Sequence, residues 1–211
     1  MTIGLIDYGA GNLQSVRNAL RALGHEATVV RDGEGLARGV DVVIFPGVGA
    51  FGDSMRHLRE QGLVEPLREW VRGGSPFFGI CIGYQVLFEG SEESPGVEGL
   101  GVFEGRVIRL RAPGLKIPHM GWNTARLKDP NDPLWEGLGP APHVYFVHSY
   151  HPEPADDSLV AATTDYGAPF ASAIRWSSGA AVQFHPEKSQ AIGLRLIDNF
   201  VRLARNVVAA A

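Results

Sequence analysis

The chain has 211 residues, of which 45% are hydrophobic and 20% charged, and its 19 basic and 23 acidic side chains give a formal net charge of −4. So large an apolar fraction excludes an intrinsically disordered chain, and the mild negative charge argues against a protein that binds nucleic acid through a basic surface. The single cysteine excludes an internal disulfide and a thiolate zinc cluster. The N-terminus carries no basic leader, and no apolar stretch approaches the roughly 20 residues that span a bilayer, so we expect a cytoplasmic protein without a membrane segment.

The first 88 residues alternate between apolar runs and segments of helical periodicity. The predicted strands are residues 2–7, 27–30, 40–45 and 76–80, and the predicted helices are about 13–23, 50–61, 63–72 and a short stretch after Cys81 that ends at Phe88. Strands that are apolar throughout have both faces buried, and their alternation with helices is typical of a parallel sheet covered on both sides. This half of the chain therefore predicts an α/β fold.

The pattern changes after residue 89. Residues 89–99 mix glutamate with Gly, Ser and Pro and predict an exposed loop. The predicted strands that follow are 102–110, 120–124, 143–147, 159–164, 171–175 and 179–184, and the runs around 106–124 are expected to form hairpins. A helix with one apolar face is predicted at about 189–207. No linker divides the chain, so we expect residues 1–211 to form one α/β domain with an antiparallel insertion.

A candidate nucleophile follows the fourth predicted strand. Gly79-Ile-Cys81-Ile-Gly83 fits the G-x-(Ser/Cys)-x-G pattern, in which small flanking residues permit a strained turn that exposes the nucleophile. A thiol at the start of a helix is favoured as the thiolate, which is the reactive form. The alternative is a buried, inert cysteine, the usual state of a lone cysteine.

A candidate base and its orienting carboxylate lie in His185-Pro-Glu187, directly after the strand predicted at 179–184. A residue before proline is pushed into extended geometry, where side chains at i and i+2 share a side. Glu187 could then hold one imidazole nitrogen of His185 and leave the other free as a general base. The alternative is a solvated histidine at a strand end beside an exposed glutamate.

Two glycine-rich turns carry weaker signals. Pro46-Gly-Val-Gly49 follows the third predicted strand and could direct main-chain amides at a developing anion, although a tight turn explains it equally well. Gly9-Ala-Gly11-Asn-Leu-Gln14 begins like a dinucleotide fingerprint, but Gln14 stands where the third glycine belongs. Asp32 lies in the region expected for a ribose contact, so a nucleotide-binding reading stays open.

Together, Cys81 in GICIGYQ, the HPE segment at 185–187 and PGVG at 46–49 resemble the class I (triad) glutamine amidotransferases. The segments IDYGAGN, PHMGWN, YFVHSYH and QFHPEKS are similar to the glutaminase subunits of imidazole glycerol phosphate synthases. The resemblance runs from residue 3 to the C-terminal helix. It implies a flavodoxin-like fold of three layers, with a mostly parallel central sheet plus antiparallel strands.

The resemblance also implies a reaction. Cys81 would attack the side-chain amide of L-glutamine to give glutamate and ammonia, with His185 as the proton carrier and Glu187 as its orienting group. The main-chain amides of Val48 and Ile82 would meet the oxyanion. No cofactor and no metal are implied.

Further positions are carried over from the same resemblance. The residues implied to bind glutamine are Gly49, Gln85, Glu93, Ser149, Tyr150 and His151. The partner implied is a (β/α)8-barrel subunit, which would use the ammonia to make imidazole glycerol phosphate and an aminoimidazole carboxamide nucleotide in histidine biosynthesis. The residues implied to face that partner are Tyr8, Asn12, Trp122, Tyr145 and Lys188. Gly47 and Gly49 would let the PGVG peptide change orientation, so that the partner switches hydrolysis on.

Other functions remain open at this point. The chain could be the glutaminase of another amidotransferase, of the anthranilate or pyridoxal-phosphate synthase type. It could also be a DJ-1-like thiol hydrolase, or a non-catalytic nucleotide-binding subunit that uses the turn at Gly9 and Gly11.

Overall fold

A computed structural model describes residues 1–9 and 13–210 and is built on a central sheet of eight strands. In spatial order these are β2 (Ala27–Val30), β1 (Ile3–Ile6), β3 (Val42–Gly47), β4 (Phe77–Cys81), β12 (Gly179–Val182), β11 (Pro169–Trp176), β10 (Val160–Asp165) and β7 (Arg126–Leu127). The strands from β2 to β12 in this order are parallel, and β12, β11, β10 and β7 pair antiparallel. The α/β fold with a mostly parallel sheet is therefore confirmed.

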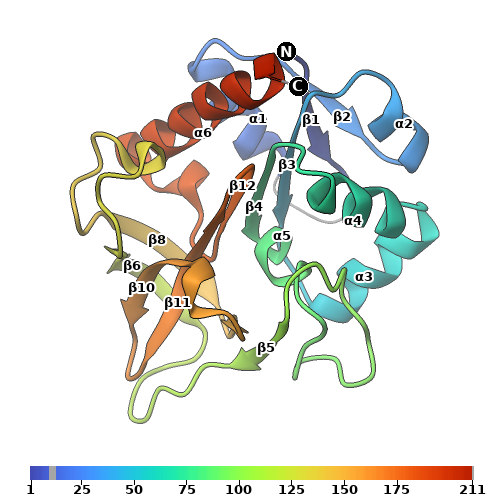
Figure 1. Ribbon diagram of the computed structural model, residues 1–211. Helices are drawn as coiled ribbons and strands as arrows, with labels where there is room; N and C mark the ends of the chain where they lie inside the picture. The colour runs from blue at the N-terminus through green and yellow to red at the C-terminus, as the bar shows by residue number, and fades with distance from the viewer. Residues whose placement is uncertain (10–12, 211) are drawn as a thin grey trace.

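Helices cover both faces of the parallel strands (Figure 1). The helices are α1 (Leu13–Ala22) and α6 (Gln190–Ala210) on one face, and α2 (Gly33–Ala37), α3 (Phe51–Glu60) and α4 (Val64–Arg72) on the other. In β3, Val42 and Ile44 pack with the first pair of helices, whereas Val43 and Phe45 pack with the second group. The uninterrupted apolar character of β3 is thus explained, because each successive side chain enters a different buried layer.

Two small antiparallel sheets lie beside the main one. β5 (Gly105–Arg109) pairs with β9 (Tyr150–Pro154), and β6 (His119–Thr124) pairs with β8 (His143–His148). The expected hairpins around residues 106–124 are therefore wrong, since β5 and β6 each pair with a strand from much later in the chain. The loop between them contains Pro113-Gly114 and a second proline, Pro118, and it separates the two strands.

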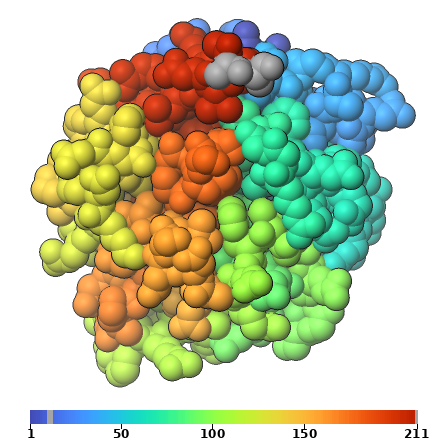
Figure 2. Space-filling model, viewed as in Figure 1, coloured from blue at the N-terminus to red at the C-terminus, as the bar shows by residue number. Residues whose placement is uncertain are grey.

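The two ends of the chain share one core. An apolar cluster brings together Ile3 of β1, Phe78 of β4, Phe146 of β8 and Phe200 of α6. Figure 2 shows α6, in red, along the upper edge of the molecule, with blue N-terminal segments beside it and an orange segment from the later part of the chain below it. Within residues 1–9 and 13–210, no helix has the length and apolarity that a membrane crossing requires.

The carboxyl ends of three parallel neighbours meet at one edge of the sheet. β3 ends at Gly47, β4 at Cys81 and β12 at Val182, and the register places Gly47 opposite Cys81 and Ile80 opposite Val182. In parallel α/β sheets this edge is where ligands bind. The sheet therefore brings the PGVG turn, the cysteine turn and the HPE segment to a single place.

Candidate active site

Cys81 ends β4 and directly precedes the single-turn helix α5 (Ile82–Gln85). Its backbone has φ +54° and ψ −102°, a conformation that is strained for a residue with a side chain. A Cβ atom on Gly83 would overlap the carbonyl oxygen of Phe45, and one on Gly79 would lie 2.5 Å from the carbonyl oxygen of Gly83. Both glycines are therefore required by close packing around the strained turn, as the motif predicted.

The helix that follows is shorter than expected. α5 contains four residues and not the stretch to Phe88, so few peptide dipoles are aligned toward the thiol of Cys81. The side chain of Cys81 is 5% exposed. Stabilisation of a thiolate here must therefore come mainly from neighbouring side chains.

His185 and Glu187 form the predicted pair. His185 has φ −103° and ψ 95°, which confirms its extended geometry, and a short 3-10 helix, η3 (Pro186–Lys188), carries Glu187. His185 Nδ1 lies 2.8 Å from Glu187 Oε1, and both side chains are 2% exposed. Among the described residues no group hydrogen-bonds to His185 Nε2. The imidazole is thus held at one nitrogen and free at the other.

The charge of His185 depends on its two neighbours. Burial works to lower the pKa of His185, but the nearby charge of Cys81, followed by the hydrogen bond and charge of Glu187, outweighs it and raises the pKa to about 10. A pKa this far above neutrality keeps the imidazole of His185 protonated at neutral pH, beside the sulfur of Cys81. Such a pair supplies both a nucleophile and a proton donor.

A cavity of about 390 Å³ opens onto the thiol. Its lining consists of Val48, Gly49, Cys81, Ile82, Gln85, Glu93, Pro118, Val147, His148, Ser149, Tyr150 and Lys188. The structure therefore gathers the expected oxyanion residues and all but one of the expected glutamine-binding residues around Cys81. Pro118, Val147 and His148 are additions that the sequence analysis did not single out, although each lies within or beside a quoted segment.

Gln85 and Glu93, which both line this cavity, are fixed by hydrogen bonds. Gln85 Nε2 lies 3.1 Å from the carbonyl oxygen of Tyr150 and 3.1 Å from Oε1 of Gln183, so both amide hydrogens are used. Glu93 Oε2 accepts from the main-chain N–H of Phe51 at 2.7 Å, at the start of α3. Both side chains are thus oriented before any ligand binds.

The PGVG turn is restrained from one side. Gly49 has φ +106°, whereas a Cβ atom on Gly47 would lie 2.7 Å from both Ile82 Cβ and the hydroxyl of Tyr8. That hydroxyl donates to the carbonyl oxygen of Val48 at 3.1 Å. Gly47 is therefore required for close packing, and Gly49 is the glycine whose backbone conformation a larger residue would strain.

Tyr8 lies inside the protein and not on a surface that a partner could reach. It is 1% exposed, its ring packs edge-on against Phe45, and burial raises the pKa of its hydroxyl to about 12. Its contacts are with the PGVG turn, so any influence of a partner on Tyr8 would be indirect. Asn12, expected at the same surface, lies outside the described residues.

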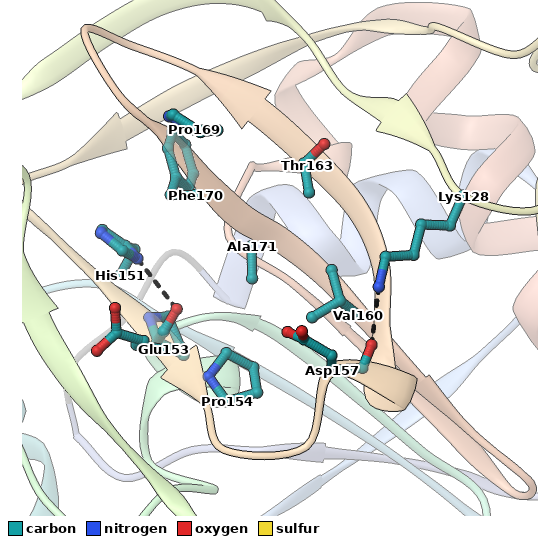
Figure 3. Close-up of a pocket in the computed structure, with 11 residues that line it drawn as sticks. Lys128, His151, Glu153, Pro154, Asp157, Val160, Thr163, Pro169, Phe170 and Ala171 are labelled. Atoms are coloured by element: carbon teal, nitrogen blue, oxygen red, sulfur yellow. Dashed lines mark hydrogen bonds between the residues drawn. The ribbon is translucent and has the colours of Figure 1, made fainter.

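His151 does not reach the cavity that contains Cys81. Successive residues of β9 point to opposite sides, so Tyr150 lines the Cys81 cavity whereas His151 lines a separate pocket of about 320 Å³. Figure 3 shows His151 in that second pocket with Glu153 and Phe170. Its Nδ1 bonds to the carbonyl of Pro152 at 3.0 Å. The structure therefore does not bring His151 together with the other residues that were expected to bind glutamine.

The remaining expected interface residues lie together beside the site. Trp122 of β6 is 42% exposed, and Met120, two residues earlier on the same side of the strand, is 63% exposed. Tyr145 pairs with Trp122 across β6 and β8, with ring centroids 6.1 Å apart, and Lys188 Nζ lies 5.9 Å from the centre of the Tyr145 ring. The main-chain carbonyl of Tyr145 accepts from the N–H of His185 at 2.8 Å, which connects this surface to the triad.

Asp32, the residue considered for a ribose contact in the nucleotide-binding hypothesis, has a structural role. The carboxylate of Asp32 accepts from the N–H of Gly35 and caps the short helix α2. Within residues 1–9 and 13–210, no cluster of three or more His, Cys, Asp or Glu side chains is arranged to hold a metal ion.

Comparison with known proteins agrees with this geometry. Residues 4–203 match the family model for glutamine amidotransferase class-I. The imidazole glycerol phosphate synthase subunit HisH of Aquifex aeolicus is 49% identical over 203 residues, covering 96% of this chain and 97% of that protein. The HisH subunit of Synechococcus elongatus is 48% identical over 201 residues, covering 94% and 92%. A crystal structure of a glutamine amidotransferase superposes with a TM-score of 0.75 at 28% identity, covering 96% of this chain and 98% of that one. The chain therefore belongs to the class-I glutamine amidotransferase family and, within it, to the HisH proteins.

Proposed function

We propose that the chain hydrolyses L-glutamine through Cys81, His185 and Glu187. The thiolate of Cys81 attacks the side-chain amide carbon, and the carbonyl electron pair moves onto oxygen. Collapse of this intermediate breaks the C–N bond, and the leaving nitrogen takes a proton from His185. Water activated by His185 then hydrolyses the γ-glutamyl thioester to glutamate. The observation that carries this proposal is the free Nε2 of an imidazole whose Nδ1 is held by a buried carboxylate beside the thiol.

The oxyanion would be met by two main-chain amides. Ile82 is the first residue of α5, so its N–H has no partner within the helix and is available to an anion. The second donor would be the N–H of Val48, which lines the same cavity. Removal of one such donor costs about 3–4 kcal/mol of transition-state stabilisation.

Glutamine would be held around these groups by the other lining residues. Gln85 has no hydrogen-bond partner at Oε1 among the described residues and can accept from the substrate, and Glu93 offers a negative charge to the substrate ammonium. Gly49, Ser149 and Tyr150 complete the proposed glutamine-binding set. His151 is not included, because it faces the other pocket.

We propose that the ammonia passes to a separate subunit. The relatives named HisH are subunits of imidazole glycerol phosphate synthase, so this chain would supply ammonia to a (β/α)8-barrel partner that makes imidazole glycerol phosphate and an aminoimidazole carboxamide nucleotide. The exposed apolar side chains of Met120 and Trp122, with Tyr145 and Lys188 beside them, suit a docking surface next to the site. As a biosynthetic enzyme it would work in the cytoplasm.

We also infer that residues 1–211 act as one glutaminase domain. The inference is supported by the central sheet, in which β4 from the first half of the chain pairs directly with β12 from the last part. The proposed triad is divided between the end of β4 and the segment that follows β12, so neither half would contain it alone.

Replacement of Cys81 tests the proposed chemistry. Cys81→Ala should abolish the formation of glutamate from glutamine, because no other thiol exists in the chain. The same variant, mixed with the barrel subunit, should still support synthesis from ammonium salts, since the ammonia-using step lies on the other chain. Glutaminase activity above a few per cent of wild type would exclude Cys81 as the nucleophile, and loss of the ammonium-dependent reaction would contradict the division of labour between the chains.

A further inference from the structure

A buried amide outside the triad contacts the sulfur of Cys81. Gln183 is fully buried, and its Nε2 lies 3.5 Å from Cys81 Sγ, a hydrogen-bond distance for the large sulfur atom. Its position follows from the sheet, because Val182 pairs with Ile80 and the next residue of each strand is therefore a neighbour. The main-chain N–H of Gln183 donates to the carbonyl of Ser172 at 2.9 Å, which anchors Gln183 to β11 just beyond the end of β12. Gln183 lies two residues before His185 on this segment.

The orientation of this amide is determined by its other partner. Gln85 lies 3.1 Å from the carbonyl oxygen of Tyr150, and a carbonyl only accepts, so the atom of Gln85 at that place is the donor Nε2. The second hydrogen of that nitrogen points to Gln183, so the facing atom of Gln183 is the acceptor Oε1, at 3.1 Å. The remaining atom of the Gln183 amide is then Nε2, and it directs an N–H at the thiol.

Buried histidines fix the far end of this hydrogen-bond chain. The carbonyl of Tyr150 also accepts from Nδ1 of His148 at 2.9 Å, so His148 carries its proton there and presents Nε2 as an acceptor. Nδ1 of His119 lies 3.1 Å from that Nε2 and must donate to it. Nε2 of His119 in turn accepts from the side-chain amide of Asn123 at 3.2 Å. Each hydrogen-bond donor between Asn123 of β6 and the sulfur of Cys81 is therefore assigned. The side-chain amides of Gln85 and Gln183 cannot turn over without breaking two hydrogen bonds.

We propose that Gln183 is a positioning residue for the nucleophile, whose Nε2–H group stabilises and aims the thiolate of Cys81. This rests on the proposed function only in so far as Cys81 is the reacting group. A hydrogen bond to an ionised acceptor is about twice as strong as one between neutral groups. The bond also compensates for the short helix α5, which aligns few dipoles toward the sulfur. His185 contributes positive charge, and Gln183 contributes a fixed neutral donor that keeps its place throughout the reaction.

The test measures the reactivity of Cys81 toward iodoacetamide from about pH 5 to about pH 10, on the full chain without glutamine. Gln183→Met removes both hydrogen bonds at nearly constant volume, whereas Gln183→Glu keeps the acceptor for Gln85 and places a carboxylate beside the sulfur. Asn199→Asp is the matched control. Asn199 is fully buried in α6, and its amide donates to the carbonyls of Leu134 and Glu136, so the same amide-to-acid change is made away from the thiol.

We expect Gln183→Met to slow alkylation near pH 7 about tenfold and to move the profile to higher pH, since a hydrogen bond to a charged group is lost. Gln183→Glu should move it further in the same direction, and Asn199→Asp should leave it in place. If the Glu variant does not fold, the Met variant alone decides. A folded Gln183→Met protein with the wild-type profile would overturn the proposal. Because the assay contains no glutamine, that outcome is distinct from failure of the proposed function, which would appear as a wild-type complex that releases no glutamate.

Discussion

The hydroxyl of Tyr8 donates a hydrogen bond to the main-chain carbonyl of Val48 over 3.1 Å and so fastens the turn that is proposed to meet the oxyanion. Tyr8 directly precedes the segment 9–12 in the sequence, and both Tyr8 and Asn12 were expected to face the partner. The bond therefore connects the end of this part of the chain to the PGVG turn. It restrains that turn in the chain alone.

Tyr8→Phe should release this restraint. The ring contact with Phe45 is kept, and one neutral hydrogen bond of about 1 kcal/mol is lost, so we expect glutamine hydrolysis by the isolated chain to rise by up to about fivefold. Initial rates of glutamate formation without the partner measure this. A basal rate that stays the same or falls would contradict the restraining role.

Hydrolysis by the isolated chain should be slow and should rise when the liganded partner binds. One misaligned oxyanion donor accounts for a difference of about 10²–10³-fold in turnover. The comparison is kcat for glutamine with the chain alone, with the empty partner and with the liganded partner. Equal rates in all three states would contradict the switch.

Gly49→Ala should weaken that activation. Gly49 has φ +106° and Gly39 has φ +76°, and neither has an atom within 4 Å of an added Cβ, so Gly39→Ala is a control with similar backbone strain. We expect each substitution to cost about 1 kcal/mol of folding stability, and only Gly49→Ala to lower liganded turnover, by more than tenfold. Full activation in Gly49→Ala would exclude a role for the conformation of this turn.

Substitutions of His185 and Glu187 should lower kcat to different extents. His185→Asn removes the proton carrier and should lower kcat by several orders of magnitude, whereas Glu187→Gln weakens only its orientation and should be milder. Steady-state rates of the liganded complex at saturating glutamine give the comparison. A loss of tenfold or less in both variants would show that the triad assignment is wrong.

The buried His119–His148 pair should make stability depend on pH. Burial lowers the pKa of His148 to about 3 and that of His119 to about 4, whereas both titrate near 6.5 in the unfolded chain. The folded protein keeps both imidazoles neutral, whereas the unfolded chain takes up protons below about pH 6.5. The free energy of unfolding is therefore highest above pH ~6.5 and falls as the pH is lowered toward 4. At pH 5 the unfolded chain gains about 2 kcal/mol from protonation of His148 alone.

Urea unfolding of wild type and His148→Phe at pH 7.5 and pH 5 checks this prediction. The variant should be less stable at pH 7.5, but its loss on acidification should be smaller than that of wild type by about 2 kcal/mol. His143, which is exposed, supplies the control, and His143→Gln should show the wild-type loss. An equal loss in wild type and His148→Phe would contradict burial of a neutral imidazole.

The buried parallel strands β1, β3 and β4 could be predicted from the sequence because each is an apolar run followed closely by glycines. The turn at Cys81 could also be predicted, because close contacts with neighbouring backbone allow only glycine at the two flanking positions, Gly79 and Gly83. β9 was not predicted, because Tyr150–Pro154 contains polar residues and two prolines and pairs with a strand far away in the sequence. α2 was missed for a related reason: its glycine-rich segment is short, and the Asp32 side chain caps it.

The structure differs from the expected site in the direction of particular side chains. His151 was expected to bind glutamine because it follows Tyr150, yet the alternation of an extended strand places the two on opposite sides. Gln183 was not singled out, although it lies two residues before His185 within the quoted segment QFHPEKS. Tyr8 was expected at the surface, and only the packing of its ring against Phe45 places it inside.

The central claim is that Cys81 carries the glutamyl group during hydrolysis. The most direct measurement is peptide mass spectrometry after an acid quench of the liganded complex during turnover of glutamine. The account predicts a γ-glutamyl thioester on the peptide that contains Cys81, formed in wild type and absent in Cys81→Ala. An adduct on any other residue, or steady release of ammonia from the Cys81→Ala complex, would contradict it.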